Sequence, residues 1–168
     1  MAKSLGPLAA DVVVERARSA IGFATRYRLG AGGRNPRAKH PAVATECDCS
    51  GFAAWCVGVD RYLPNGAIPH LPGGEWFETS SLWRDARTPF GFVVEVDWDA
   101  ARPGDLVVYG DKGKSQGHVG VVVEASGGPT RVVHCSGGNG RRGDAIAETG
   151  PEVFVRGGAL VARVQWVG

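Results

Sequence analysis

Cys49 is the residue of this chain best placed for nucleophilic chemistry. It stands in the segment DCSGF at residues 48–52, directly before an apolar run that extends to position 59. A thiol attacks as its thiolate, and a helix N-terminus with a nearby histidine lowers the pKa of a cysteine. Taken alone, such a cysteine is more often a buried structural residue. We predict that Cys49 begins a helix, has a lowered pKa and is a nucleophile, and that Gly51 lets another backbone segment approach closely.

Two histidines occupy positions suited to a base and to a residue that orients it. His118 opens the apolar run that continues over residues 119–124, and His134 lies near the end of the run at residues 131–135. If these runs pair as a hairpin, both histidines lie at the same end of the ladder, where His134 would hold the imidazole of His118 in one tautomer. Cys135 would then point to the opposite face and into the core. A thiol nucleophile and its base are commonly far apart in sequence.

The spacing of apolar residues indicates which elements position these residues, and this spacing differs between the two halves of the chain. Helical spacing of apolar residues predicts one helix in the first half, and a second, buried helix follows from position 49. The second half is rich in valine and is divided by turn residues, which indicates a meander of strands. The sequence therefore predicts a single α+β domain over residues 1–168. The predicted helices are residues 8–22 and 49–59, the predicted long loops are 28–48 and 63–91 (the latter with one short helix), and the predicted strands are 92–98, 105–109, 119–124, 131–135 and 159–166.

The composition excludes several other classes of protein. The chain has 168 residues with 43% hydrophobic and 21% charged residues, which is typical of a globular domain. A net charge of +2 is too balanced to indicate nucleic acid as a partner. No run of about 20 apolar residues predicts a membrane span. Residues 1–15 show no apolar segment of a signal peptide, so we expect a cytoplasmic protein or one exported by a route other than the Sec pathway.

Four segments, in this order, carry a resemblance to a known family. They are DCSGF at 48–52, PGDLVVY at 103–109, GHVGVVVE at 117–124 and VVH at 132–134. Together they resemble the NlpC/P60 cysteine peptidases, over roughly residues 10–135. The resemblance implies a papain-like fold, in which N-terminal helices, one bearing the cysteine, pack on a central antiparallel sheet that bears the histidines.

The resemblance also implies roles for individual residues. Cys49 would be the nucleophile, His118 the general base and acid, and His134 the orienting third residue, with no metal or cofactor. The implied substrate is the stem peptide of bacterial peptidoglycan or a fragment of it. The implied reaction cleaves the bond between the γ-carboxyl of D-glutamate and diaminopimelate or lysine.

Three further residues are implied to line the site and bind the N-terminal end of the substrate peptide: Tyr27, Asp48 and Ser50. The sequence departs from the family's usual pattern before the nucleophile, because Arg26 precedes Tyr27 where the family often has proline. Residues 34–47 form an insertion that also carries basic side chains.

Other interpretations remain open from the sequence. Cys47, Cys49 and Cys56 with a histidine are candidates for a zinc site, although their spacing lacks the paired C-x2-C pattern. A disulfide between Cys47 and Cys56 is a second alternative. The same fold also permits acyl transfer, an amidase acting outside the wall, or a wall-peptide-binding module without turnover. The sequence identifies no delivery or immunity partner.

Overall fold

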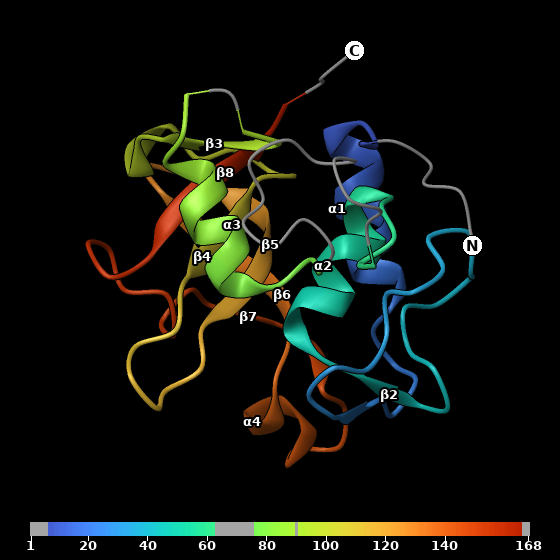
Figure 1. Cartoon of the computed structure of the whole chain (residues 1–168). Helices are drawn as coiled ribbons and strands as arrows, with labels where there is room; N and C mark the ends of the chain where they lie inside the picture. The colour runs from blue at the N-terminus through green and yellow to red at the C-terminus, as the bar shows by residue number, and fades with distance from the viewer. Residues whose placement is uncertain (1–6, 63–75, 90, 166–168) are drawn as a thin grey trace.

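A six-stranded antiparallel sheet forms the centre of the molecule. The computed structural model describes residues 7–62, 76–89 and 91–165. The sheet has the order β3-β8-β4-β5-β6-β7 and is antiparallel at every pairing. A separate parallel pair, β1-β2, lies outside it (Figure 1). The strands are β1 Arg26–Tyr27, β2 Glu46–Cys47, β3 Val93–Val96, β4 Leu106–Tyr109, β5 His118–Ala125, β6 Pro129–Cys135, β7 Ile146–Thr149 and β8 Leu160–Val164.

Three helices cover one face of this sheet. α1 and α2 pack on each other and on β5 and β6, and α3 packs on β3, β4 and β8 (Figure 1). Two shorter helical turns connect strands elsewhere in the chain. The bounds are α1 Ala10–Ser19, α2 Cys49–Val57, α3 Thr79–Ala86, the 3-10 turn η1 Trp98–Ala100 and α4 Gly137–Gly140.

The sequence around α2 fixes where this helix begins and ends. Asp48 caps it by accepting a hydrogen bond from the Gly51 backbone N–H, at 2.8 Å. Gly58 ends it in the left-handed conformation, with φ of 85°. All nine residues of α2 are buried, and a helix that is apolar on every side lies in a core. Cys49 is thereby held at the N-terminus of a rigid, fully packed element.

Different parts of the chain pack on the two faces of the sheet. The helices and odd-numbered positions such as Val119 and Val121 of β5 form the main core. On the other face, Val122 and Val132 pack with Phe154, which comes from the loop between β7 and β8. Because side chains alternate along a strand, His118 and His134 also belong to this second face. The functional candidates therefore meet at the end of the sheet, where α2 and β5 both begin.

Most of the elements predicted from the sequence are present. The α+β class, the helix at Cys49 and the antiparallel sheet carrying the histidines are confirmed. The first helix is shorter than predicted. The strand predicted at 159–166 covers Leu160–Val164, and residue 166 lies outside the described part of the chain. Residues 63–75 of the predicted long loop also lie outside it. The prediction missed β7, α4, β1 and β2. None of the helices in the described ranges has the length and apolar character to cross a membrane.

Candidate active site

The Cys49 thiol lies at the junction between α2 and β5. Its residue is only 5% exposed. The backbone N–H groups of Val119 and Ser50 both hydrogen-bond the sulfur and stabilise its thiolate. As the first residue of α2, Cys49 also has an N–H group with no acceptor inside the helix. That N–H group is available to a carbonyl oxygen brought to the thiol.

The two histidines form a hydrogen-bonded pair, as predicted from the hairpin. His118 Nε2 lies 2.8 Å from His134 Nδ1, and His134 Nε2 lies 2.9 Å from Thr149 Oγ1. The Thr149 hydroxyl donates its own hydrogen to the carbonyl oxygen of Gly150, at 2.7 Å. Thr149 Oγ1 must therefore accept from His134 Nε2–H, which leaves His134 Nδ1 to accept from His118 Nε2–H. The lone pair of His118 is consequently on Nδ1.

An aromatic ring supports both imidazoles from the second face of the sheet. Phe154 stacks on His118 with 5.2 Å between ring centroids and an interplanar angle of 10°, and it meets His134 edge-on at 5.8 Å. Gly120 makes room for this ring, since a Cβ there would lie 2.5 Å from Val132 Cγ1 and 3.2 Å from Phe154 Cζ. Glycine at position 120 thus keeps this side of β5 clear, and Phe154 fills the space.

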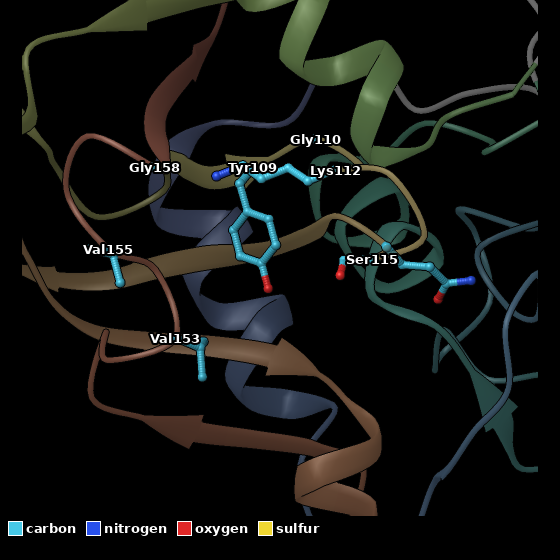
Figure 2. A pocket seen from close by; sticks show the side chains of 8 residues that line it. Tyr109, Gly110, Lys112, Ser115, Val153, Val155 and Gly158 are labelled. Atoms are coloured by element: carbon cyan, nitrogen blue, oxygen red, sulfur yellow. The ribbon is translucent and has the colours of Figure 1, made fainter.

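Three adjoining hollows run across the site. The first contains Cys49, with Tyr27, Asp48 and Ser50 in its wall, and the second contains His118 and His134. Both are bordered by Tyr27, Gln116 and Gly117. A third hollow shares Tyr109, Gln116 and Val153 with the second. Figure 2 shows the lining of this third hollow. The structure thus places the predicted residues in neighbouring hollows that share lining residues. Among the described residues, no hydrogen bond joins Cys49 to His118.

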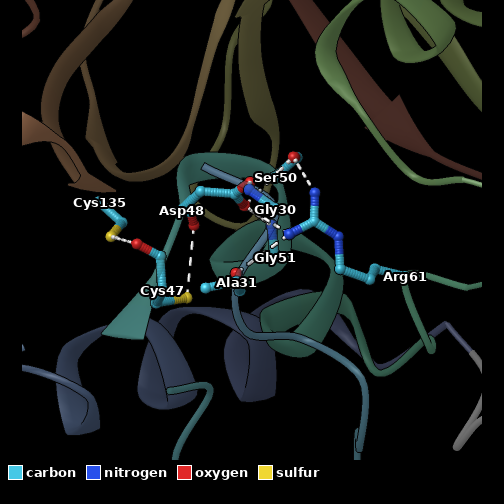
Figure 3. Close-up of polar contacts among 8 residues, drawn as sticks. All are labelled: Gly30, Ala31, Cys47, Asp48, Ser50, Gly51, Arg61 and Cys135. Atoms are coloured by element: carbon cyan, nitrogen blue, oxygen red, sulfur yellow. Dashed lines mark hydrogen bonds and ion pairs between the residues drawn. The ribbon is translucent and has the colours of Figure 1, made fainter. Parts of the chain in front are cut away.

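A buried ion pair fixes the N-terminus of α2. Arg61 Nη1 lies 2.6 Å from Asp48 Oδ1, and Arg61 Nη2 donates to Ser50 Oγ at 2.8 Å (Figure 3). The other carboxylate oxygen of Asp48 accepts from the Gly30 N–H at 2.6 Å. Each partner of this ion pair makes several hydrogen bonds, and these compensate for the cost of removing the two charges from water. Arg61 was not predicted from the sequence, because residues 59–61 carry no signal that relates them to Asp48.

The close backbone approach predicted at Gly51 is also present. A Cβ on this residue would lie 2.7 Å from the Ala31 carbonyl oxygen and 2.8 Å from that of Gly32. The loop that bears Ala31 and Gly32 can therefore lie directly on the first turn of α2. Glycine at position 51 is what allows the loop to form one wall of the thiol site.

The other three cysteines are buried, and none of them borders the hollow of Cys49 or that of the histidines. Cys135 is in the core, as predicted, and its thiol donates to the Cys47 carbonyl oxygen at 3.3 Å. Cys47 and Cys56 are free thiols. Within the described ranges, no group of three or more histidine, cysteine and acidic side chains is arranged to hold a metal ion.

Burial governs the protonation of the site. It raises the pKa of the Cys49 thiol to about 12, assisted by the Asp48 carboxylate, and outweighs the opposing backbone N–H groups. Burial, followed by the neighbouring His134, lowers the pKa of His118 to about 3, and burial lowers that of His134 to about 4. The prediction of a lowered thiol pKa is wrong for the free protein, because it considered the helix N-terminus and omitted desolvation. The resting site is a neutral thiol beside neutral imidazoles.

Comparison with known proteins adds one match. A family model described as CHAP domain matches residues 39–139, which include Cys49, His118 and His134 and form more than half of the chain. A search of curated proteins found no match.

Proposed function

Because the chain belongs to the CHAP domain family, and is by that membership a hydrolase acting on cell-wall peptidoglycan, we propose that it is a cysteine peptidase. In this proposal Cys49 is the nucleophile, His118 the general base and acid, and His134 the residue that orients His118. The family agrees with the NlpC/P60 resemblance of the sequence. The general activity of such a domain is that of an amidase or peptidase on the wall, and the particular bond is part of the proposal.

The observation that carries this assignment is the hydrogen-bond chain from Thr149 through His134 to His118. It fixes the tautomer of His118 so that Nε2 carries the hydrogen and Nδ1 carries the lone pair. A base needs its lone pair on the nitrogen that faces the proton to be removed. The chain thus supports a proton-accepting role for His118, with His134 and Thr149 acting through it as positioning residues.

The proposed reaction begins with a neutral thiol. His118 Nδ1 takes the proton as Cys49 Sγ attacks the carbonyl carbon, so that the S–C bond forms while the imidazole becomes positively charged. The oxyanion accepts a hydrogen bond from the Cys49 N–H. His118 then gives the proton to the leaving amine as the C–N bond breaks. Water attacks the thioester while His118 again accepts a proton. His118 then returns this proton to Cys49 Sγ as the C–S bond breaks, which releases the acid and restores the thiol.

The raised pKa of Cys49 has a mechanistic consequence. Without a standing thiolate, proton transfer to His118 accompanies attack. A bound substrate also excludes further water and strengthens the attraction between the developing imidazolium and thiolate. The site would therefore be unreactive until substrate occupies it, which limits side reactions of a free thiolate in the absence of wall peptide.

The acyl part of the substrate would lie in the hollow around Cys49. Tyr27, Asp48 and Ser50, which we propose to line the path of this part, all border that hollow. The oxygens of Asp48 already accept from Gly51, Gly30 and Arg61. We therefore propose that Asp48 contributes chiefly by holding the residues that line the hollow in place, and that Tyr27 and Ser50 present groups to the peptide.

The scissile bond of this proposal joins the γ-carboxyl of D-glutamate to a diamino acid in a stem peptide. The test is digestion of purified peptidoglycan and of free stem tetrapeptide, read by mass spectrometry. We expect wild-type protein to release fragments that end in D-glutamate, and Cys49→Ala to release none. Cys56→Ala, which removes a buried thiol from the same helix, is the matched control and should retain cleavage.

The products also separate the competing reactions. Digestion in H2 18O should place one heavy oxygen on the new carboxyl group, because water is the acyl acceptor. Cleavage between muramic acid and L-alanine would instead make the protein a wall amidase. Equal cleavage by wild type and Cys49→Ala would remove Cys49 as the nucleophile.

A further inference from the structure

The third hollow lies beyond the histidines and has a chemistry of its own. It is bordered by Tyr109, Val153 and Val155, together with the turn that carries Lys112 and Ser115 (Figure 2). Figure 2 shows the Tyr109 ring between the valine-bearing loop and that turn, and the Lys112 side chain extending above the ring toward Gly158. Its volume is about 170 Å³, below the roughly 300–1,000 Å³ of pockets for drug-sized ligands. The hollow has room for one amino-acid side chain.

The order of the hollows decides which part of the substrate reaches this one. The carbonyl carbon must lie at Cys49 Sγ, with its oxygen toward the N-terminus of α2. The leaving nitrogen must lie toward His118, which gives it a proton. The third hollow shares Tyr109, Gln116 and Val153 with the hollow of the histidines, whereas Cys49 borders the first. The leaving-group residue, and not the acyl part, is therefore directed into it.

Its lining combines an apolar wall with one cation. Val153 and Val155 are 50% and 67% exposed, although they are large hydrophobic side chains. Lys112 is the single charged residue among the described residues that line the hollow. The neighbouring carboxylate of Asp111 borders the first hollow instead and accepts hydrogen bonds from the Gly117 N–H and the Thr79 hydroxyl.

We infer that this hollow selects diaminopimelate over lysine as the leaving-group residue of the substrate, with the aliphatic chain against Val153 and Val155 and the distal carboxylate near Lys112. The inference rests on the proposed function, since it takes the direction of the substrate from the roles of Cys49 and His118. Both diamino acids have the same aliphatic chain, and they differ at its distal end by one carboxylate.

Charge provides the discrimination. The distal end of lysine is an ammonium, which Lys112 repels, whereas the distal end of diaminopimelate pairs its ammonium with a carboxylate and has no net charge. Lys112 is exposed, so screening by solvent limits the effect to about three- to tenfold.

The experiment compares two synthetic tripeptides that differ only in this carboxylate: L-alanyl-γ-D-glutamyl-meso-diaminopimelate and L-alanyl-γ-D-glutamyl-L-lysine. We expect wild type to show about three- to tenfold higher kcat/KM on the diaminopimelate peptide, and Lys112→Met to abolish this preference. Lys114→Met removes an exposed lysine from the same turn that does not border the hollow. It should keep the wild-type preference. Equal preference in wild type and Lys112→Met would overturn the inference.

A binding measurement keeps this test independent of turnover. Free meso-diaminopimelate and free L-lysine are titrated into Cys49→Ala, and the methyl signals of Val153 and Val155 are followed by NMR. We expect both methyl pairs to shift with diaminopimelate, with affinity reduced about three- to tenfold by adding Lys112→Met. If neither peptide is cleaved but these shifts occur, the proposed function fails and the selectivity of the hollow stands. Valine signals that do not respond to diaminopimelate would overturn the inference even if both peptides are cleaved.

Discussion

Thr149→Val isolates the contribution of the hydrogen-bond chain to the proposed catalysis. The substitution keeps the shape of the side chain and removes the hydroxyl that accepts from His134 Nε2, at 2.9 Å. A buried donor left without its acceptor costs about 1–3 kcal/mol. His134 can avoid this cost by moving its hydrogen to Nδ1, which then faces the hydrogen on His118 Nε2. Either response disturbs the tautomer that leaves the His118 lone pair on Nδ1.

The expected result is a fall in kcat with little change in KM. A loss of about 1.4–2.7 kcal/mol in the transition state corresponds to about ten- to a hundredfold in rate. Thr149 borders neither the hollow of Cys49 nor that of the histidines, so substrate binding should be nearly unchanged. Thr149→Ser retains the hydroxyl and is the matched control, which we expect to keep most of the wild-type kcat.

Two assays test this reasoning together. Steady-state kinetics on the diaminopimelate tripeptide gives kcat and KM, and long-range 1H–15N NMR reports which imidazole nitrogen carries hydrogen. We expect His134 to carry it on Nε2 in wild type and in Thr149→Ser. A folded Thr149→Val protein with wild-type kcat would refute the claim that the chain positions His118. A fall in kcat shared equally by Thr149→Ser would also refute it, because that variant keeps the hydrogen bond.

Three further predictions concern the charges of the site. Arg61→Met removes one partner of a buried ion pair, and urea unfolding should show a free energy of unfolding lowered by about 3–5 kcal/mol. The control is Arg156→Met, which removes one partner of an exposed pair and should lower it by less than about 1 kcal/mol. Similar losses in the two variants would contradict this prediction. The free energy of unfolding should reach its full value above about pH 6.5, the pKa of histidine in the unfolded chain. As the pH decreases from there toward 4, it should fall by about 1.4 kcal/mol per pH unit for each of His118 and His134. The reason is that the unfolded chain binds protons that the native histidines, with pKa values of about 3 and 4, do not. Urea unfolding between pH 4 and 7 measures this, and a slope unchanged in His134→Gln would contradict it. Iodoacetamide should alkylate Cys49 slowly at pH 7 and faster as pH increases toward 12, and an inflection in the alkylation rate below pH 8 would show that the thiol pKa is not raised.

The main elements of the site were predictable because their signals are local. Asp48 and Gly51 mark the start of a helix within a few residues, and valine-rich runs bounded by turns indicate strands. The hairpin between β5 and β6 then placed His118 near His134, since antiparallel pairing brings the ends of adjacent strands together.

The parts that the sequence did not predict depend on contacts between distant segments. Thr149 lies on a four-residue strand without clear alternation, and Phe154 lies in a loop with no regular period. Arg61 reaches Asp48 through the tertiary fold. The pKa of Cys49 was predicted in the wrong direction because desolvation is a property of packing. Each of these features requires knowledge of what surrounds the side chain.

The most direct test of the central claim is intact-protein mass spectrometry of samples quenched in acid during turnover of the diaminopimelate tripeptide. The proposed mechanism predicts a mass increase equal to the L-alanyl-γ-D-glutamyl acyl group, located by digestion on the peptide that contains Cys49. His118→Ala should show little of this adduct, because the thiol then lacks its base. An acyl adduct on another residue, or turnover that continues in Cys49→Ala, would contradict the account.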